Sequence, residues 1–259
     1  MVGNLEGNFG GLISKPIILL DILNYLMEKI KNIGHINSAI QTNWGNCDNA
    51  RFYENTPIKT HKYFASKGGL ANYSDLKLIE QYLSKAKSIL EVGAGYGRVI
   101  EYLIKKNSYN IKKIYALERS QKYYKILQKK FSYKIKIFNS DLFDFKVKIK
   151  FDLILWLWSG ITDFSESEQF LAMSILTKHL KKRGIFILDT FAHNVKPSNT
   201  NNSQNQHYAT NIGDYMLRGY IPSPRTILKY GEKLGFANTE YLPYCTSTCR
   251  PRSLYILSK

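Results

Sequence analysis

The segment that most constrains the fold of this chain is residues 89–99, which read ILEVGAGYGRV. Apolar residues 88–92 lead into a loop with three alternating glycines, and a helical pattern follows over residues 99–106. Glycine tolerates positive φ angles and lets the backbone approach a ligand closely, and the first turn of a helix offers unpaired N–H groups. The segment therefore predicts a strand, a ligand-binding loop and a helix.

The alternation of strand and helix continues along the chain. Residues 151–157 are apolar almost throughout, as expected of a strand that is covered on both faces. Such alternation favours an α/β fold, in which a parallel sheet carries helices on both faces. The predicted strands are 88–92, 113–117, 134–138, 151–157, 184–188, 239–245 and 253–257, and the predicted helices are 74–87, 99–106, 121–131, 165–184 and 223–235. The last two strands predict a hairpin at the sheet edge.

Two regions differ in character from this pattern. Residues 1–70 predict an N-terminal cap, with one helix that begins near Pro16 and ends near Gly34, followed by a short helix and an aromatic loop. Residues 71–259 form the predicted main domain. Within it, polar residues 194–206 predict a surface loop, part of a lid-like loop at about 194–222.

Composition limits the compartment and the partners. The 259 residues are 44% hydrophobic and 22% charged, enough for a full core. We find no apolar run of the roughly 18–20 residues that span a bilayer, and no signal-peptide pattern. Three cysteines form no disulfide framework, and Cys245 and Cys249 lack a second pair for zinc. We expect a cytoplasmic protein without a membrane partner or a metal site.

An acid precedes the glycine loop. Glu91 lies two residues before the first glycine, and Arg98 occupies the position of the third glycine in the dinucleotide pattern G-x-G-x-x-G. A carboxylate at this place would repel a pyrophosphate. It suits a ligand with a cationic amine.

The segment ILEVGAGYGRV resembles motif I of the class I S-adenosylmethionine-dependent methyltransferases, hydrophobic-x-(D/E)-x-G-x-G-x-G. The later acids of that family have counterparts here, since Glu118 ends IYALE and Asp141 follows the third strand. The resemblance covers about residues 75–190. It implies a Rossmann-like, seven-stranded, mostly parallel sheet and S-adenosyl-L-methionine as the cofactor.

The resemblance also implies roles for single residues. Glu118 would bind both ribose hydroxyls, and Asp141 the adenine amino group, with Asp144 as the alternative. Tyr96 and Trp158 would offer aromatic faces to the sulfonium. The predicted cofactor-binding residues are Glu91, Gly93, Ala94, Gly95, Tyr96, Gly97, Glu118, Arg119, Asp141, Leu142, Leu157 and Trp158.

The segment after the fourth strand bears on the methyl acceptor. Residues 157–164, LWSGITDF, lack both the proline motif of the base amino-methyltransferases and the cysteine of the cytosine C5 enzymes. The stretch looks more like small-molecule N-methyltransferases related to glycine N-methyltransferase, which implies a metabolite N or O acceptor. The predicted substrate-facing residues are Tyr53, Ser159, Asp163, Asp189 and His193. No catalytic residue is identified. The alternatives are an RNA or protein methyltransferase, a non-catalytic S-adenosylmethionine-binding protein, and an aminopropyl transferase.

The chain has a net charge of +17, and the predicted fold indicates where the excess basic residues lie. Residues 71–150 contain 18 Lys and Arg against 7 Asp and Glu, and many of these lysines lie at predicted helix C-termini or just before strands. Both places lie at the edge of a parallel sheet that is opposite to the ligand edge. We therefore expect a solvated face, or a docking surface for an anionic partner. Nucleic acid is the less favoured partner, and no pattern indicates an oligomeric state.

Overall fold

The computed structural model describes residues 48–106, 109, 111–192 and 207–259. The chain divides into two compact units, Met1–Cys47 and Asp48–Lys259, and all described residues belong to the second. The predicted helix between Pro16 and Gly34, the candidate His193 and the polar stretch 194–206 lie outside the described residues.

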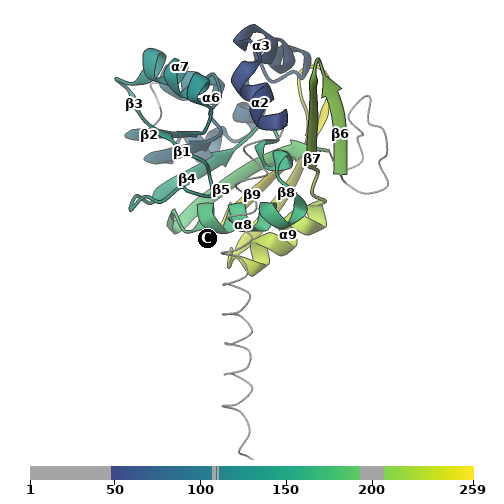
Figure 1. Ribbon diagram of the computed structural model, residues 1–259. Helices are drawn as coiled ribbons and strands as arrows, with labels where there is room; N and C mark the ends of the chain where they lie inside the picture. Colours follow the sequence, from purple (N-terminus) through teal and green to yellow (C-terminus); the bar gives the residue numbers. More distant parts are fainter. Residues whose placement is uncertain (1–47, 107–108, 110, 193–206) are drawn as a thin grey trace, which may run out of the picture. The chain divides into compact units, whose positions relative to one another are not determined.

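A seven-stranded sheet forms the centre of the second unit (Figure 1). Five strands are parallel, and β9 is antiparallel to both of its neighbours, so that the C-terminal hairpin closes one edge. The predicted Rossmann-like fold is thereby confirmed. The strand order is β3 (Ile135–Asn139), β2 (Lys113–Glu118), β1 (Ser88–Val92), β4 (Phe151–Trp156), β5 (Leu180–Phe191), β9 (Pro251–Ser258) and β8 (Asn238–Cys245).

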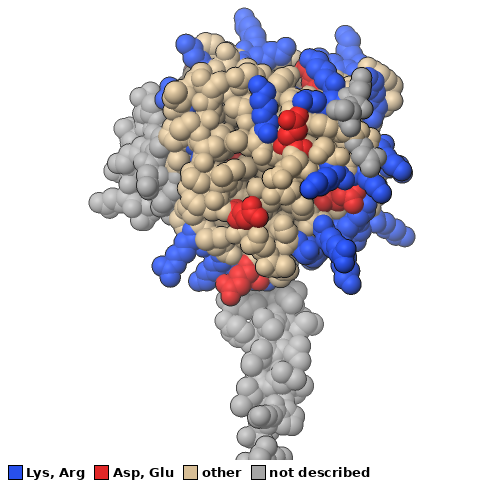
Figure 2. Space-filling model, turned by 180° about the vertical axis from the view of Figure 1, so that it is seen from behind, with Lys and Arg blue, Asp and Glu red and all other residues tan. Residues whose placement is uncertain are grey.

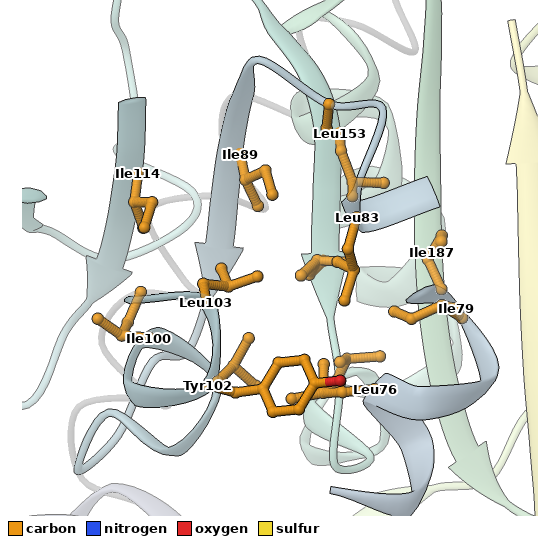
Figure 3. Close-up of a cluster of buried hydrophobic side chains, with 14 of the residues drawn as sticks. Leu76, Ile79, Leu83, Ile89, Ile100, Tyr102, Leu103, Ile114, Leu153 and Ile187 are labelled. Atoms are coloured by element: carbon orange, nitrogen blue, oxygen red, sulfur yellow. The ribbon is translucent and has the colours of Figure 1, made fainter. Parts of the chain in front are cut away.

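Helices cover both faces of this sheet. One face carries α4 (Ser74–Leu78), α5 (Glu80–Leu83), α6 (Arg98–Lys105) and α7 (Gln121–Phe131), and the other carries α8 (Glu166–Thr177) and α9 (Pro224–Lys233). Figure 3 shows the first interface, where side chains of α4, α5 and α6 pack on those of β1, β2, β4 and β5. Leu76, Ile79, Leu83, Ile89 and Ile100 are fully buried there. Burial of this apolar area stabilises the layers by roughly 25 cal/mol per Å².

Two helix predictions differ from the structure. The predicted helix over 74–87 is broken at Ile79, which has a φ of −106° between α4 and α5. The predicted helix over 165–184 ends at Thr177, and β5 begins at Leu180. Leu180 is buried and the next three residues are exposed. One buried residue followed by three exposed ones shows neither the 3.6-residue repeat of a helix nor the two-residue repeat of a strand. The sequence pattern of this stretch therefore does not indicate where the helix ends and the strand begins.

The predicted aromatic loop before residue 70 contains two helices, α2 (Asp48–Asn55) and α3 (Ile58–Lys67), and both belong to the same compact unit as the sheet. Pro57 separates them, because a residue that precedes proline avoids the helical region.

The described part of the predicted lid-like loop is a hairpin of β6 (His207–Ile212) and β7 (Tyr215–Tyr220), with Gly213 in its turn at a φ of +59°. Helix α2 lies on this hairpin. The side-chain oxygen of Asn49 accepts from Arg218 N at 2.9 Å, and its amide nitrogen donates to Arg218 O at 2.7 Å.

Charged side chains gather at the rim of the molecule. Figure 2 shows one face, with many Lys and Arg side chains around its margin and few acidic ones. Lys105 and Lys129 lie in the last turns of α6 and α7, where cations complement the helix dipole. A docking role for this charge stays a prediction. Among the described residues, no helix has the length and apolar character needed to cross a membrane.

A buried ion pair joins α4 to α6. Arg98, the first residue of α6, donates to both carboxylate oxygens of Asp75 at 2.5 and 2.9 Å, and also to Leu70 O at 3.1 Å. The two side chains are 6% and 0% exposed. Their neighbour Glu101 forms an exposed pair with Lys105 at 2.7 Å.

Replacing Asp75 with Ala should lower the free energy of unfolding by about 3–5 kcal/mol, because the guanidinium of Arg98 would stay buried without its partner. Glu101→Ala is the matched control, and breaking its exposed pair should cost less than about 1 kcal/mol. Urea unfolding of both variants measures the difference. Equal losses for the two variants would contradict this account.

Candidate functional site

The glycine loop lies at the carboxyl end of β1. Gly93, Gly95 and Gly97 have φ angles of +67°, +54° and +89°, in the left-handed region that favours glycine. Two backbone bonds fix the loop, Gly93 N to Leu117 O at 2.8 Å and Gly97 N to Ala94 O at 2.9 Å. Among the described residues, no atom beyond its chain neighbours lies within 4 Å of the place that a Cβ at Gly93 would take. One side of the loop is therefore open to a ligand.

The opposite side of the loop packs tightly on α7. A Cβ at Gly97 would lie 2.6 Å from a ring carbon of Phe131 and 3.0 Å from a methyl of Leu127. Gly97 also immediately precedes α6. Only glycine satisfies both the backbone angle and this contact, so the turn is held rigidly where the helix begins.

Glu91 is the acid in front of the loop. It is 5% exposed, and its Oε2 has no hydrogen-bond partner among the described residues. Burial raises the pKa of this carboxyl well above its usual range, and the nearby Arg98 guanidinium partly opposes the shift. A buried carboxylate oxygen without a donor is costly, and a cationic or N–H donor from a ligand would satisfy it.

Glu118 ends β2 beside the loop. Its two oxygens accept from Gly95 N and from Ser120 N, each at 2.7 Å. Burial raises the pKa of this carboxyl, and the bonds from Ser120 and Gly95 act in the opposite sense. A carboxylate with two oxygens at the loop can accept both hydroxyls of a vicinal diol.

Asp141 follows β3 on the same edge. Its Oδ2 lies 3.4 Å from a guanidinium nitrogen of Arg119, and its Oδ1 accepts from Phe143 N at 3.0 Å. Leu142 is buried, whereas Asp144 is exposed. Because Arg119 directly follows Glu118, the structure brings the two predicted acids to neighbouring strand ends.

Two predicted aromatic residues meet across the loop. The rings of Tyr96 and Trp158 lie 6.3 Å apart, edge to face, and the Arg98 guanidinium lies 5.9 Å from the Trp158 ring. The predicted neighbours Leu157 and Ala94 are buried. Trp158 and Ser159 have φ angles of 55° and 60°, a left-handed turn directly after β4.

Tyr123 belongs to this edge, although no motif indicated it. It is 2% exposed, and its hydroxyl has no hydrogen-bond partner among the described residues. Burial, and then the charge of Glu118, raise the pKa of the hydroxyl. The sequence did not indicate this residue, because a tyrosine hydroxyl that points toward a site leaves no repeating pattern in the sequence. His61 of α3 lies 5.6 Å from its ring, and burial lowers the pKa of this histidine to about 4.

Two of the predicted acceptor residues come together. The hydroxyls of Tyr53 in α2 and Tyr208 in β6 bond to Asp163, which ends the 3-10 helix η1 (Gly160–Asp163). Asn49 Nδ2 also donates to Asp163 Oδ1 at 3.4 Å. Burial raises the pKa of Asp163 to about 6, and the bond from Tyr53 opposes part of that shift. Tyr208 went unnoticed because its strand was expected to be a loop.

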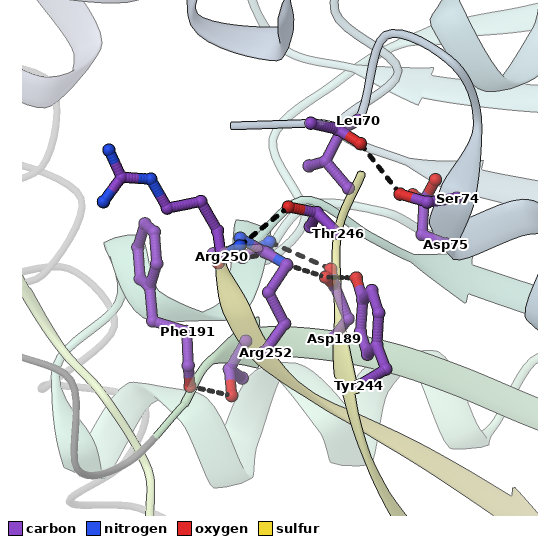
Figure 4. A network of polar contacts seen from close by, with 12 residues as sticks. Leu70, Ser74, Asp75, Asp189, Phe191, Tyr244, Thr246, Arg250 and Arg252 are labelled. Atoms are coloured by element: carbon purple, nitrogen blue, oxygen red, sulfur yellow. Dashed lines mark hydrogen bonds and ion pairs between the residues drawn. The ribbon is translucent and has the colours of Figure 1, made fainter. Parts of the chain in front are cut away.

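The other two described candidates face inward. Asp189 is 0% exposed and accepts from Ser159 N at 3.1 Å, Arg252 Nε at 2.6 Å and Tyr244 Oη at 2.9 Å. Arg252 also donates to Ser159 Oγ at 2.7 Å. Figure 4 shows Arg252 and Tyr244 converging on Asp189 from the C-terminal hairpin. These side chains are therefore engaged by the protein itself.

Solved structures share this fold. The sugar N-methyltransferase KedS8 from Streptoalloteichus matches with a TM-score of 0.59 and 14% identity, over 78% of this chain and 91% of that one. The amino pentose methyltransferase CalS10 from Micromonospora echinaspora, with S-adenosylmethionine bound, matches with a TM-score of 0.57 and 13% identity, over 78% and 96%. The 1,6-didemethyltoxoflavin-N1-methyltransferase from Burkholderia thailandensis, with S-adenosylhomocysteine bound, matches with a TM-score of 0.60 and 12% identity, over 87% and 89%.

Sequence comparison gives the family. No curated protein matches the chain, but the sequence model described as PRMT5 arginine-N-methyltransferase matches residues 30–187. The predicted class, the S-adenosylmethionine-dependent methyltransferases, is thereby confirmed, and the finer relation to glycine N-methyltransferase stays a prediction. Because the match spans more than half of the chain, this protein belongs to the PRMT5 arginine-N-methyltransferase family.

Proposed function

We propose that this protein transfers a methyl group from S-adenosyl-L-methionine to a nitrogen or oxygen of a small molecule. The observation that carries the proposal is the glycine loop with its open side, flanked by the buried carboxyls of Glu91 and Glu118. The unpartnered Oε2 of Glu91 suits the ammonium of the cofactor, and Glu118 suits its ribose. Asp141 at the next strand end would hold the adenine amino group.

Around the methyl donor, the residues of the chain would bind and orient the cofactor. When bound, S-adenosylmethionine supplies a methyl group that its sulfonium sulfur activates. Tyr96 and Trp158 would present ring faces to that cation. The rigid turn at Gly97 would keep the donor in line with the acceptor, and such alignment is a large part of the catalysis of a bimolecular transfer.

The acceptor site would lie where Asp163 meets Tyr53 and Tyr208. A carboxyl whose pKa is about 6 is suited to take a proton from an acceptor near neutral pH. The names of the similar proteins above give small molecules as their methyl acceptors, namely a sugar, an amino pentose and 1,6-didemethyltoxoflavin. This supports a small acceptor for the present protein. Ser159 and Asp189, which are buried and bonded to each other, would hold the backbone next to this site in place.

Arginine methylation in a protein is the second candidate, and the family match favours it. The deciding experiment incubates the enzyme with methyl-labelled S-adenosylmethionine and either a metabolite extract or arginine-containing peptides. We expect label in small molecules. Label in peptides alone would replace the proposal with the second candidate, and no label with either acceptor pool would overturn both.

Binding of S-adenosylmethionine should weaken as the pH falls through the raised pKa of Glu91. The carboxyl is buried, so it takes up a proton more readily than usual, and the protonated form no longer attracts an ammonium. Titration calorimetry over a pH series measures this. Glu91→Gln should bind more weakly and lose most of the dependence, and an unchanged profile in that variant would assign the dependence to another group.

Replacing Asp163 with Asn should lower kcat by about 10²–10⁴ if it accepts the proton of the acceptor, while affinity for S-adenosylhomocysteine stays unchanged. The acid limb of the kcat profile, near pH 6 in the native enzyme, should disappear with it. Asp214→Asn, in the exposed β6–β7 turn, is the control. A normal pH profile in Asp163→Asn would show that another group takes the proton.

A further inference from the structure

We infer that the ion pair between Asp189 and Arg252 is a positioning element for methyl transfer: it holds the Trp158–Ser159 turn in its left-handed conformation and so sets the Trp158 indole against the glycine loop. The inference rests on the proposed use of that loop as the site of the methyl donor. Neither member of the pair would touch donor or acceptor, because both act through the turn.

The turn needs such support. Two successive residues other than glycine have positive φ angles, 55° at Trp158 and 60° at Ser159. A bulky aromatic residue rarely adopts this conformation, and it persists only where surrounding contacts impose it. The turn directly follows β4 and leads into η1, so a change of these angles would move both the indole and Asp163.

The contacts that hold this turn in its left-handed conformation come from residues far along the chain. Asp189 Oδ1 accepts from Ser159 N at 3.1 Å, and Arg252 Nη2 donates to Ser159 Oγ at 2.7 Å. Arg252 Nε closes the triangle with Asp189 Oδ2 at 2.6 Å. Ser159 thus donates one bond through its backbone N–H and accepts one through its hydroxyl, with partners 30 and 93 positions away. Figure 4 shows Asp189, near the end of β5, beside Arg252 at the beginning of β9.

The pair is itself fixed. Asp189 and Arg252 are 0% and 4% exposed, and Tyr244 of β8 donates to Asp189 at 2.9 Å. The Arg252 guanidinium also lies 5.2 Å from the Phe191 ring. Arginine suits the place because its planar fork points Nε and Nη2 at two acceptors at once. Lysine carries the same charge but has no second donor in a fixed direction.

The indole, in turn, is held on its other side. Its ring meets the Tyr96 ring edge to face at 6.3 Å and lies 5.9 Å from the Arg98 guanidinium. Arg98 is anchored to Asp75 in the buried pair described above. Two buried arginine–aspartate pairs therefore flank Trp158, one through its backbone turn and one against its ring. This arrangement gives the turn one defined place over the loop.

A merely structural pair and a positioning pair make different predictions, and Arg252→Lys distinguishes them. We expect this variant to fold, because the charge is retained, but to bind S-adenosylhomocysteine about tenfold to a hundredfold more weakly. Its Trp158 emission should shift to the red as the indole leaves its contacts, and the loss of that emission in Trp158→Phe assigns the signal. Arg250→Gln, two residues earlier and exposed, should change neither affinity nor emission.

Relief of the backbone strain gives a second test. Ser159→Gly in the Arg252→Lys background should restore a large part of the affinity and the emission, because glycine adopts a positive φ without strain. A variant Arg252→Lys with a lowered Tm but native affinity and native emission, measured well below that Tm, would overturn the inference, as would a double variant without recovery. If the wild type itself binds no S-adenosylhomocysteine, the proposed function fails. The emission of Arg252→Lys then still decides the positioning claim.

Discussion

Two carboxyl groups are buried at the ends of neighbouring parallel strands, and the structure around the site depends on how each is satisfied. Glu118 accepts two backbone N–H groups of the loops beside it, so its oxygens are supplied by the chain. Glu91 has an oxygen with no donor in the described part of the chain. Burial of such a group is unfavourable unless a partner arrives. The open side of the glycine loop is where that partner can come, and this contrast between the two acids is the basis of the proposed donor site.

The surroundings of these acids are built to keep the loop still. α7 packs against Gly97 so closely that no side chain fits there, and Arg98 is tied to α4 through Asp75. On the facing side, the Trp158 turn is tied to the C-terminal hairpin through Asp189. Rigid supports of this kind reduce the reorganisation that a transfer reaction needs. The proposed donor site is thus held from elements on both sides of β1 and β4.

The acceptor side has a different construction. α2 contributes Tyr53 and Asn49 to the cluster around Asp163 of η1, and β6 contributes Tyr208. Polar contacts to Asp163 thus link the three elements. A cluster assembled from separate segments can vary in composition without disturbing the sheet, which suits a role in selecting the acceptor.

Much of this could be predicted from the sequence, because the strands and the glycine loop are local patterns. The apolar run of β4 and the alternating glycines of the loop can each be recognised within one short segment of the sequence. The hairpin of β6 and β7 escaped detection because residues 207–220 alternate only weakly in hydropathy, and Gly213 with Asp214 is a short turn signal inside polar sequence. The orientation of the Asp189 side chain could not be predicted from the sequence for another reason. Its partner Arg252 lies 63 positions away, and only the antiparallel register of β5 with β9 brings the two together.

A crystal structure of the protein with S-adenosylhomocysteine tests the central claim most directly. We predict that the amino group of the ligand lies within hydrogen-bond distance of Glu91 Oε2, with both ribose hydroxyls at Glu118. A ligand bound elsewhere, or an empty glycine loop at saturating concentration of the compound, would contradict it.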